Sequence, residues 1–257
     1  MKSIRTMTNQ LPQDNEQSFI SHLVELRDRL LKVVLCVLLV FLGTASYANE
    51  IYAYLAEPLL QHMPKNSTMI AIDVASPFFT PFKLAFVVAV FASIPVILYQ
   101  FWGFVAPGLY RHEKLMVAPL LLASTLLFYG GAAFAYFLVF PLVFGYLTSA
   151  APVGVAVMTD ITTYLDFVLA MFFAFGLSFE IPIVTIVLVW TGIITPQSLA
   201  EKRPYVIVGV FVIAMFLTPP DALSQTLLAV PMWLLFEAGL LCSRLIAKKS
   251  SAAEDRG

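Results

Sequence analysis

The stretch that decides the fold is FWGFVAPGLYRHEKL, residues 101–115. An uncharged hydrophobic run ends here, and a short polar loop carries Arg111, His112, Glu113 and Lys114. Because the hydrophobic run on each side is long enough to cross a bilayer, the loop is expected at a membrane surface. Glu113 is the one carboxylate in this basic loop, and we interpret it as half of a site for a positively charged peptide.

Composition gives the broad class. Of 257 residues, 60% are hydrophobic and 12% charged, and the mean hydropathy is +0.87. A soluble domain has about 25% charged residues, so the sequence predicts an integral membrane protein. The formal net charge of -1 gives no indication of nucleic-acid binding.

Cys36 and Cys242 lie inside apolar runs, so we expect neither a disulfide nor a metal site. Residues 1–18 are polar, which is unlike a cleavable signal peptide.

Six apolar runs approach the roughly 20 helical residues that cross a bilayer. The predicted spans lie near residues 31–49, 82–104, 116–140, 164–190, 204–218 and 225–246. The runs are continuously apolar and do not alternate, which favours helices over a barrel. The prediction is an all-α polytopic protein with a membrane domain over 18–246, a polar N-terminal tail over 1–17 and a cytoplasmic tail over 247–257.

The fifth run is short. Only 15 residues separate Arg203 from Pro219 and Pro220, which as a helix spans about 22 Å, less than the ~30 Å hydrocarbon slab. We expect short fifth and sixth helices.

Lys and Arg set the orientation. Of the 15 basic residues, all but Lys65 and Lys83 fall on the side of the membrane that holds both termini. By the positive-inside rule, both termini are predicted to be cytoplasmic.

Residues 17–32, QSFISHLVELRDRLLK, are typical of an amphipathic helix that runs into the first span, and we expect this helix to lie along the cytoplasmic surface. Glu25 has Arg29 four residues later. Spacing alone favours a solvated pair within the helix over a binding role.

Glu180, in FAFGLSFEIPIV, lies well inside the fourth predicted span. A charge there costs roughly 2.5–3.5 kcal/mol or more, so we expect Glu180 to face the bundle or a wet cavity and favour a functional role. Glu237, in the last span, is expected to pair with either Arg203 or Arg244. Its role is left open between structure and function.

The external segments are predicted to form a structured cap. Ser76 before Pro77 is expected to be a helix N-cap, and Phe78 follows at the interface. Asp160 is the only charge of its loop and suggests little chemistry, while Asp166 is expected to be a cap or an interface residue.

At the turn before the last span, Asp221 is expected to cap the sixth helix. Gln225 follows at the edge of the bilayer, where an amide often joins two helices.

No phosphate-binding GxxxxGK[ST], GxSxG or zinc-protease motif occurs, so catalysis and an ATP site are not expected. Besides a peptide-binding protein, two classes of function stay open at this point. One is a proton-coupled small-solute carrier with Glu180 as its titrating group, and the other is a structural membrane scaffold.

Several motifs in sequence resemble the TatC family, the core subunit of the twin-arginine protein translocase. They are SHLVELRDRL (21–30), ASPFFTPFKL (75–84), FWGFVAPGLYRHEK (101–114), FGLSFEIPI (175–183), KRPYVIVG (202–209) and LTPPDALSQTLLAVPM (217–232). The resemblance covers about residues 18–246. Asp166 has no role that the resemblance implies.

The resemblance implies a cup-shaped receptor in the cytoplasmic membrane. It would bind folded precursors by their twin-arginine signal peptides, work with the single-span partners TatA and TatB, and draw on the proton gradient, with no cofactor and no metal. Carried over by position, the implied signal-peptide residues are Glu25, Glu113, Arg27, Leu30 and Phe104. The implied intramembrane polar site is Glu180, the external cap residues are Pro58 and Phe78, and the partner-helix docking residues are Asp221, Gln225 and Met215.

Overall fold

The computed structural model describes residues 13–61, 69–105, 117–149, 158–217 and 222–254. The helices, in order, are α1 (Gln13–Thr44), η1 (Ala45–Tyr47), α2 (Ala48–Leu60), α3 (Ser76–Ala92), α4 (Ile94–Val105), α5 (Val117–Phe134), η4 (Ala135–Val139), α6 (Phe140–Ser149), α7 (Ile161–Trp190), α8 (Pro196–Glu201), α9 (Arg203–Leu217) and α10 (Ala222–Glu254). Among these residues the only β contact is an isolated bridge, so the predicted all-α class is confirmed.

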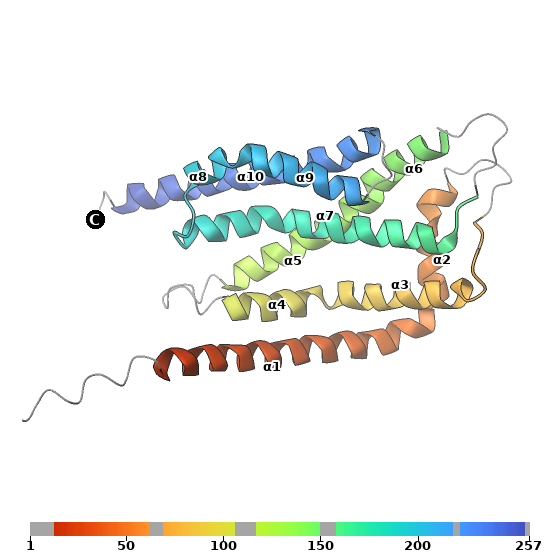
Figure 1. Ribbon diagram of the computed structural model, residues 1–257, viewed down its shortest axis with the longest axis horizontal. Helices are drawn as coiled ribbons and strands as arrows, with labels where there is room; N and C mark the ends of the chain where they lie inside the picture. The colour runs from red at the N-terminus through yellow and green to blue at the C-terminus, as the bar shows by residue number, and fades with distance from the viewer. Residues whose placement is uncertain (1–12, 62–68, 106–116, 150–157, 218–221, 255–257) are drawn as a thin grey trace, which may run out of the picture.

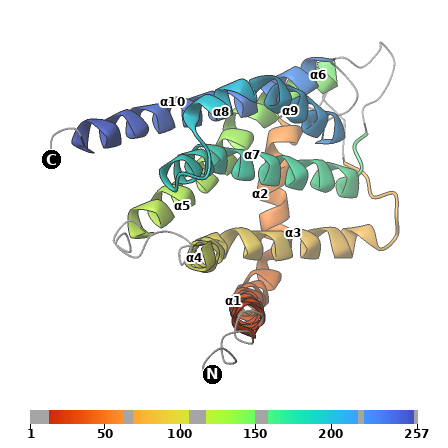
Figure 2. The same ribbon diagram turned by 60° about the vertical axis from the view of Figure 1, so that its left-hand side comes forward.

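The long helices run roughly side by side in layers (Figure 1). α1 forms one edge and packs against α3 and α4, while α9 and α10 lie at the opposite edge, beyond α7. Figure 2 shows α2 crossing these layers, from α3 towards α6. α1 begins and α10 ends at the same end of the molecule, where α4 also ends (Figure 1).

Four helical segments within the described ranges are long and apolar enough to cross a membrane, and the bent pair α3–α4 makes a fifth. α9 is apolar but has only 15 residues, in agreement with the predicted short fifth helix. The count of six crossings stays a prediction. The prediction of a short sixth helix is wrong. α10 has 33 residues and continues past its apolar part, Gln225–Leu245.

The N-terminal segment also differs from expectation. Residues 17–32 do not form a separate surface helix, because they are the first part of the continuous 32-residue α1. Helical hydrogen bonding continues from the amphipathic part into the apolar part without a glycine or proline to break it before Gly43. α1 therefore carries its polar side chains directly in line with the first span.

α7 is the centre of the core, with α5 and α10 packed on it more extensively than any other helix pair. Its buried residues Leu165, Val168, Met171 and Phe175 recur at helical spacing. Close approach depends on glycine: a Cβ at Gly131 of α5 would lie 2.5 Å from the Phe175 carbonyl oxygen. The packing of the centre is therefore set by backbone contact as well as by side chains.

α3 and α4 meet at an angle of 50°. The bend follows from Pro95, which lacks the N–H that would bond the Phe91 carbonyl four residues earlier. The Tyr129 hydroxyl of α5 donates a 2.8 Å hydrogen bond to that carbonyl instead. The break is thus satisfied by a neighbouring helix, as a break at membrane depth must be.

The expected structured cap is present in the described residues. The Tyr164 hydroxyl of α7 donates to the Leu55 carbonyl (2.8 Å), and the Tyr136 hydroxyl of η4 donates to the Tyr54 carbonyl (3.2 Å). These two hydrogen bonds hold α2 across α7 and η4. Ser76 is not the N-cap of α3: Ala75 takes that position, and the Ser76 hydroxyl donates to the Asp73 carbonyl.

Asp160 has a larger structural role than its sequence suggested. It caps α7 by accepting from the Thr163 backbone N–H (3.0 Å), and it accepts from the Ile72 backbone N–H (3.2 Å) of the segment before α3. The Thr163 hydrogen bond holds the pKa of the Asp160 carboxyl below its usual range. The cap therefore stabilises the fold above the carboxyl's unfolded pKa, and this contribution is lost as the pH falls through the lower folded value.

Adjacent glycines of α5 test the close contact with α7. Gly131→Ala should destabilise the protein by about 1–3 kcal/mol, because its Cβ meets backbone atoms of Phe175 that cannot move without displacing α7. Gly130→Ala meets nothing nearer than a Phe179 side-chain atom at 4.0 Å, so it should be neutral or stabilise by about 0.5–1 kcal/mol through helix propensity. Thermal unfolding of both variants in detergent measures the difference, and equal Tm values would contradict the proposed backbone contact.

Candidate functional site

A cluster of polar side chains joins the start of α1 to the end of α4. Glu25 and Arg29 lie one turn apart on the same face of α1, and both Nε (3.0 Å) and Nη2 (2.6 Å) of Arg29 donate to Oε1 of Glu25. The Glu25 side chain is 37% exposed and that of Arg29 is 23% exposed. The intrahelical pair predicted from spacing is present, but it is only partly solvated.

Arg29 also binds α4. Its Nη2 donates to the Gly103 carbonyl (2.9 Å), and its Nη1 lies 3.4 Å from the Gln100 side-chain oxygen. Gly103 leaves room for this contact, because a Cβ there would lie 2.6 Å from Nη1 of Arg29. One guanidinium therefore ties α1 to the last turn of α4.

An aromatic pair completes the cluster. His22 of α1 stacks on Phe104 of α4 with ring centroids 4.2 Å apart and planes at 20°. Nδ1 of His22 lies 3.9 Å from Oε2 of Glu25. His22 thus lies between the Phe104 ring and the Glu25 carboxylate.

The buried carboxyl of Glu180 forms a second site, between α4, α5 and α7. The Ser124 hydroxyl donates to Oε2 of Glu180 (2.5 Å), and the Trp102 indole N–H donates to the Ser124 oxygen (3.1 Å). Oε1 of Glu180 is buried and has no hydrogen-bond partner among the described residues. The expectation that Glu180 faces the bundle is confirmed.

α9 is attached to α10 by two polar contacts. Arg203 and Glu237 form an ion pair: Nη2 donates to Oε2 (2.7 Å), while Nε lies 2.7 Å from Oε1 without forming a hydrogen bond. The Gln225 amide donates to the Phe211 carbonyl (3.0 Å). The sequence left the partner of Glu237 open between Arg203 and Arg244, and the partner is Arg203.

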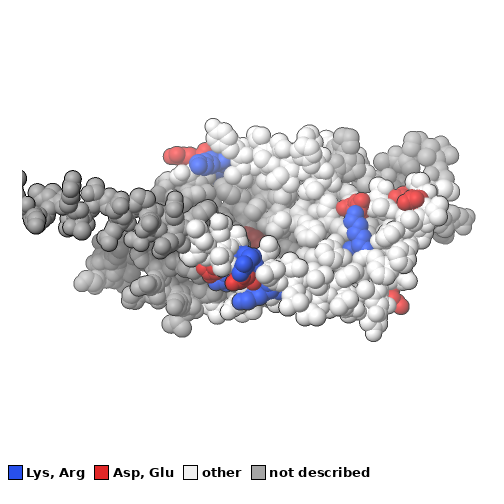
Figure 3. Space-filling view, turned by 60° about the horizontal axis from the view of Figure 1, so that its bottom comes forward, with Lys and Arg blue, Asp and Glu red and all other residues white. Residues whose placement is uncertain are grey.

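Charged groups are sparse on the surface, as Figure 3 shows for one face, and basic atoms lie beside acidic ones in several of its groups. One pair that the sequence missed is Lys83 of α3 with Asp166 of α7 (2.5 Å). The two residues are 83 positions apart, so no local pattern indicates the contact.

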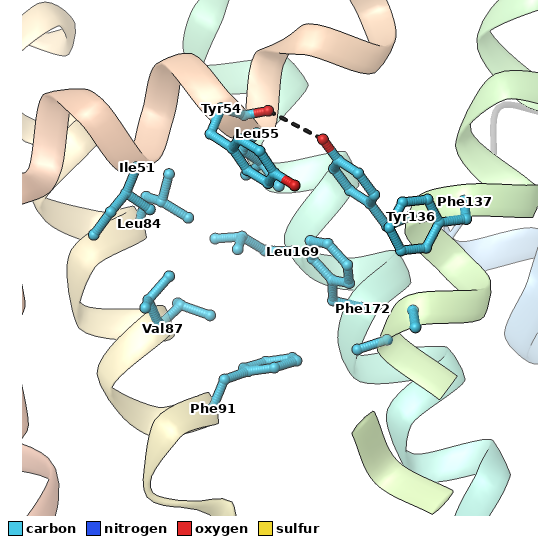
Figure 4. Close-up of a pocket in the computed structure, with 13 residues that line it drawn as sticks. Ile51, Tyr54, Leu55, Leu84, Val87, Phe91, Tyr136, Phe137, Leu169 and Phe172 are labelled. Atoms are coloured by element: carbon cyan, nitrogen blue, oxygen red, sulfur yellow. Dashed lines mark hydrogen bonds between the residues drawn. The ribbon is translucent and has the colours of Figure 1, made fainter. Parts of the chain in front are cut away.

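A cavity of about 350 Å³ lies under α2, between α3, α5, η4 and α7 (Figure 4). Its lining includes Tyr54, Phe91, Tyr136 and Phe172 and holds no charged residue. Glu180 is not part of it, so the cavity does not match the titrating site expected of a proton-coupled carrier.

Comparison with known proteins identifies the family. Residues 21–231 match the family described as Sec-independent protein translocase protein (TatC). The chain belongs to the TatC family. It is 58% identical over 236 residues to TatC of Haemophilus influenzae, covering 92% of each chain, and 55% identical over 242 residues to TatC of Escherichia coli K12, covering 94% of each.

The fold agrees with this assignment. A crystal structure titled twin arginine translocase receptor TatC superposes with a TM-score of 0.79 at 40% identity, covering 87% of this chain and 98% of that one. A second, in the detergent DDM, gives 0.79 at 38% identity, covering 86% and 99%.

Within this member of the TatC family, the structure brings together some of the implied signal-peptide residues and not others. Glu25 and Phe104 lie in one cluster. Arg27 instead pairs with its neighbour Asp28 on another side of α1, where both side chains are exposed (2.7 Å), and Leu30 is 59% exposed. Glu113 lies outside the described residues, in the segment that begins one residue after Val105.

The other implied sites are only partly described. Pro58 lies within α2, and Phe78 is exposed in the first turn of α3, packed against the rings of Phe79 and Phe82. Met215 is exposed on α9, whereas Asp221 lies outside the described residues. The binding roles of all these residues stay predictions.

The chain of hydrogen bonds from Trp102 to Glu180 predicts an order of stability. Ser124→Ala removes the link and leaves two buried polar groups without partners, so it should cost about 1–3 kcal/mol, whereas Trp102→Phe removes one donor and should cost about 0.5–1.5 kcal/mol. Ser178→Ala is the matched control, because that buried hydroxyl bonds only the Ala174 carbonyl of its own helix. Thermal unfolding in detergent measures all three, and a Ser124→Ala loss no larger than that of Ser178→Ala would count against the network.

Proposed function

We propose that this protein is the receptor subunit of a twin-arginine translocase. It binds the twin-arginine signal peptides of folded precursor proteins and, with TatA and TatB, exports them across the cytoplasmic membrane by using the proton motive force. The observation that carries the proposal is the half-exposed Glu25 carboxylate, held beside Phe104 where α1 meets the end of α4. The transport unit is residues 18–246, with polar tails on either side.

A carboxylate at this position suits an arginine ligand. A guanidinium presents five N–H donors in a planar fork, and charge-assisted hydrogen bonds from such a fork are about twice as strong as neutral ones. A peptide with two adjacent arginines needs a second acceptor, and Glu113 supplies it in the proposal. The segment that holds Glu113 follows directly from the turn of α4 that carries Phe104.

The proposed orientation places the site where precursors arrive. The start of α1, the end of α4 and the end of α10 lie at one end of the molecule (Figure 1). Together with the basic residues of the sequence, this supports cytoplasmic N- and C-termini in a multi-pass protein of the inner membrane. Glu25 then faces the cytoplasm.

The partner helices are proposed to dock on α9 and α10. α9 exposes large apolar side chains on much of its surface, including Tyr205, Val208, Met215 and Phe216. At 15 residues it is also shorter than each of the four helical segments long enough to cross a membrane. A single-span partner such as TatA or TatB would cover this surface, and we propose Met215, Gln225 and Asp221 as its contacts. The protein itself acts by binding, with no catalytic residue, cofactor or metal.

Export tests the role of Glu25. In cells that lack their own TatC, Glu25→Gln should reduce export of a folded twin-arginine reporter by at least about tenfold, because the amide has no negative charge and offers the guanidinium one acceptor oxygen where the carboxylate offers two. Glu201→Gln removes a carboxylate at the end of α8, outside the proposed site, and should export normally. The measurement is the exported fraction of the reporter at equal membrane levels of each variant. Normal export by Glu25→Gln would refute the assigned role.

Cross-linking separates a peptide receptor from a carrier or an inert scaffold. A photoreactive phenylalanine in place of Phe104 should capture a twin-arginine signal peptide, and an arginine-to-lysine version of that peptide should be captured several-fold less. The matched control is the same probe in place of Leu122, which is exposed on α5 away from Glu25. Equal capture at both positions, or none at position 104, would contradict the proposed binding site.

A further inference from the structure

The proposed receptor site already holds a guanidinium that belongs to the protein. Arg29 donates through Nε and Nη2 to a single oxygen of Glu25, Oε1. A carboxylate can accept a two-point fork on its two oxygens, but here both donors lie on one. The Glu25 carboxylate is therefore already paired with an arginine of the protein itself.

The other oxygen is left for a ligand. Oε2 of Glu25 accepts no hydrogen bond from the part of the chain that the structure describes, and Nδ1 of His22 lies 3.9 Å from it. The Glu25 side chain is more than one-third exposed, so solvent reaches it. An incoming cation would meet one free oxygen of a carboxylate whose charge is already paired.

Arg29 is a fixed part of this arrangement. Its guanidinium is also bound to the Gly103 carbonyl and lies against the Gln100 side chain, so leaving Glu25 would break contacts with α4 as well. If a peptide arginine displaced Arg29, Glu25 would exchange one guanidinium for another, and the contacts of Arg29 with α4 would be lost. The geometry therefore favours addition of the peptide at Oε2 over exchange.

A paired carboxylate discriminates between cations differently from a bare one. The positive charge of Arg29 cancels much of the field of Glu25, so a compact ammonium gains little from charge attraction alone. A guanidinium still gains from directed hydrogen bonds to Oε2, through the same fork that Arg29 uses on Oε1. Nearby positive charge thus lowers affinity for the wrong ligand more than for the right one.

We propose that Arg29 is a positioning residue that sets the specificity of the receptor: by holding Oε1 and neutralising Glu25, it makes the site select arginine over lysine in the signal peptide. The inference rests on the proposed function, because it assumes that Glu25 meets the peptide. It adds a residue whose role is discrimination, acting through Glu25.

The test compares two peptides that differ only in twin arginine or twin lysine. Capture of each is titrated with the full-length protein in membranes that contain TatA and TatB, and the ratio of the two apparent affinities is the readout. Arg29→Gln should reduce the arginine-to-lysine ratio roughly three- to tenfold, mainly by increased lysine-peptide capture, because Glu25 regains its full charge. That extra capture should fall steeply with added salt.

Two matched variants complete the design. Arg29→Lys keeps the charge and should hold the ratio within about twofold of the wild type. Lys32→Gln removes an exposed positive charge three residues along α1 and should leave the ratio unchanged. Should Arg29→Gln fail to accumulate, Arg29→Met removes the same charge while keeping an apolar stem, and its ratio is interpreted in the same way.

The outcomes are separable. If Arg29→Gln loses both peptides equally, Arg29 only holds α1 to α4 and the inference is overturned; an unchanged ratio, or an Arg29→Lys ratio as low as that of Arg29→Gln, overturns it too. If the wild type itself does not prefer the arginine peptide, the proposed function fails, and the inference fails with it.

Discussion

A charged or strongly polar side chain in a bilayer has to find its partner within the protein, because lipid offers none. Several polar groups of the described helices follow this constraint, although Oε1 of Glu180 and Nε of Arg203 are buried without a hydrogen-bond partner among the described residues. Glu25 and Arg29 join α1 to α4, Lys83 and Asp166 join α3 to α7, Ser124 and Glu180 join α5 to α7, and Arg203 and Glu237 join α9 to α10. Each contact satisfies a costly group and also connects two helices in an arrangement whose apolar surfaces gain little from packing against one another rather than against lipid.

The last turn of α4 is where these contacts converge. Gln100 and Gly103 bind Arg29, Phe104 stacks on His22, and Trp102 leads through Ser124 to Glu180. The surface carboxylate and the buried one are therefore connected through a single helical turn. The turn is separated from α3 by the 50° bend at Pro95.

The sequence predicts what depends on local pattern. Hydropathy gives the apolar helices, and the four-residue spacing of Glu25 and Arg29 gives their pair, because both depend on neighbours along one helix. It does not give contacts between distant segments. Arg29 reaches Gly103, Lys83 reaches Asp166, and Asp160 bonds the Ile72 backbone, across separations of 74, 83 and 88 positions. The sequence also does not give the direction of the first part of α1, because an amphipathic pattern shows which face is polar and not whether the helix turns at the membrane surface.

α9 makes its polar contacts with α10 and leaves an apolar surface facing outward. Its first residue is tied to α10 by the Arg203–Glu237 pair, and the Gln225 amide binds the Phe211 carbonyl past its midpoint. These two contacts fix the helix on α10. What remains outward is apolar, and the helix is about 22 Å long, less than the hydrocarbon thickness. Lipid can cover such a surface only by thinning, so a partner helix that replaces lipid there also relieves the mismatch.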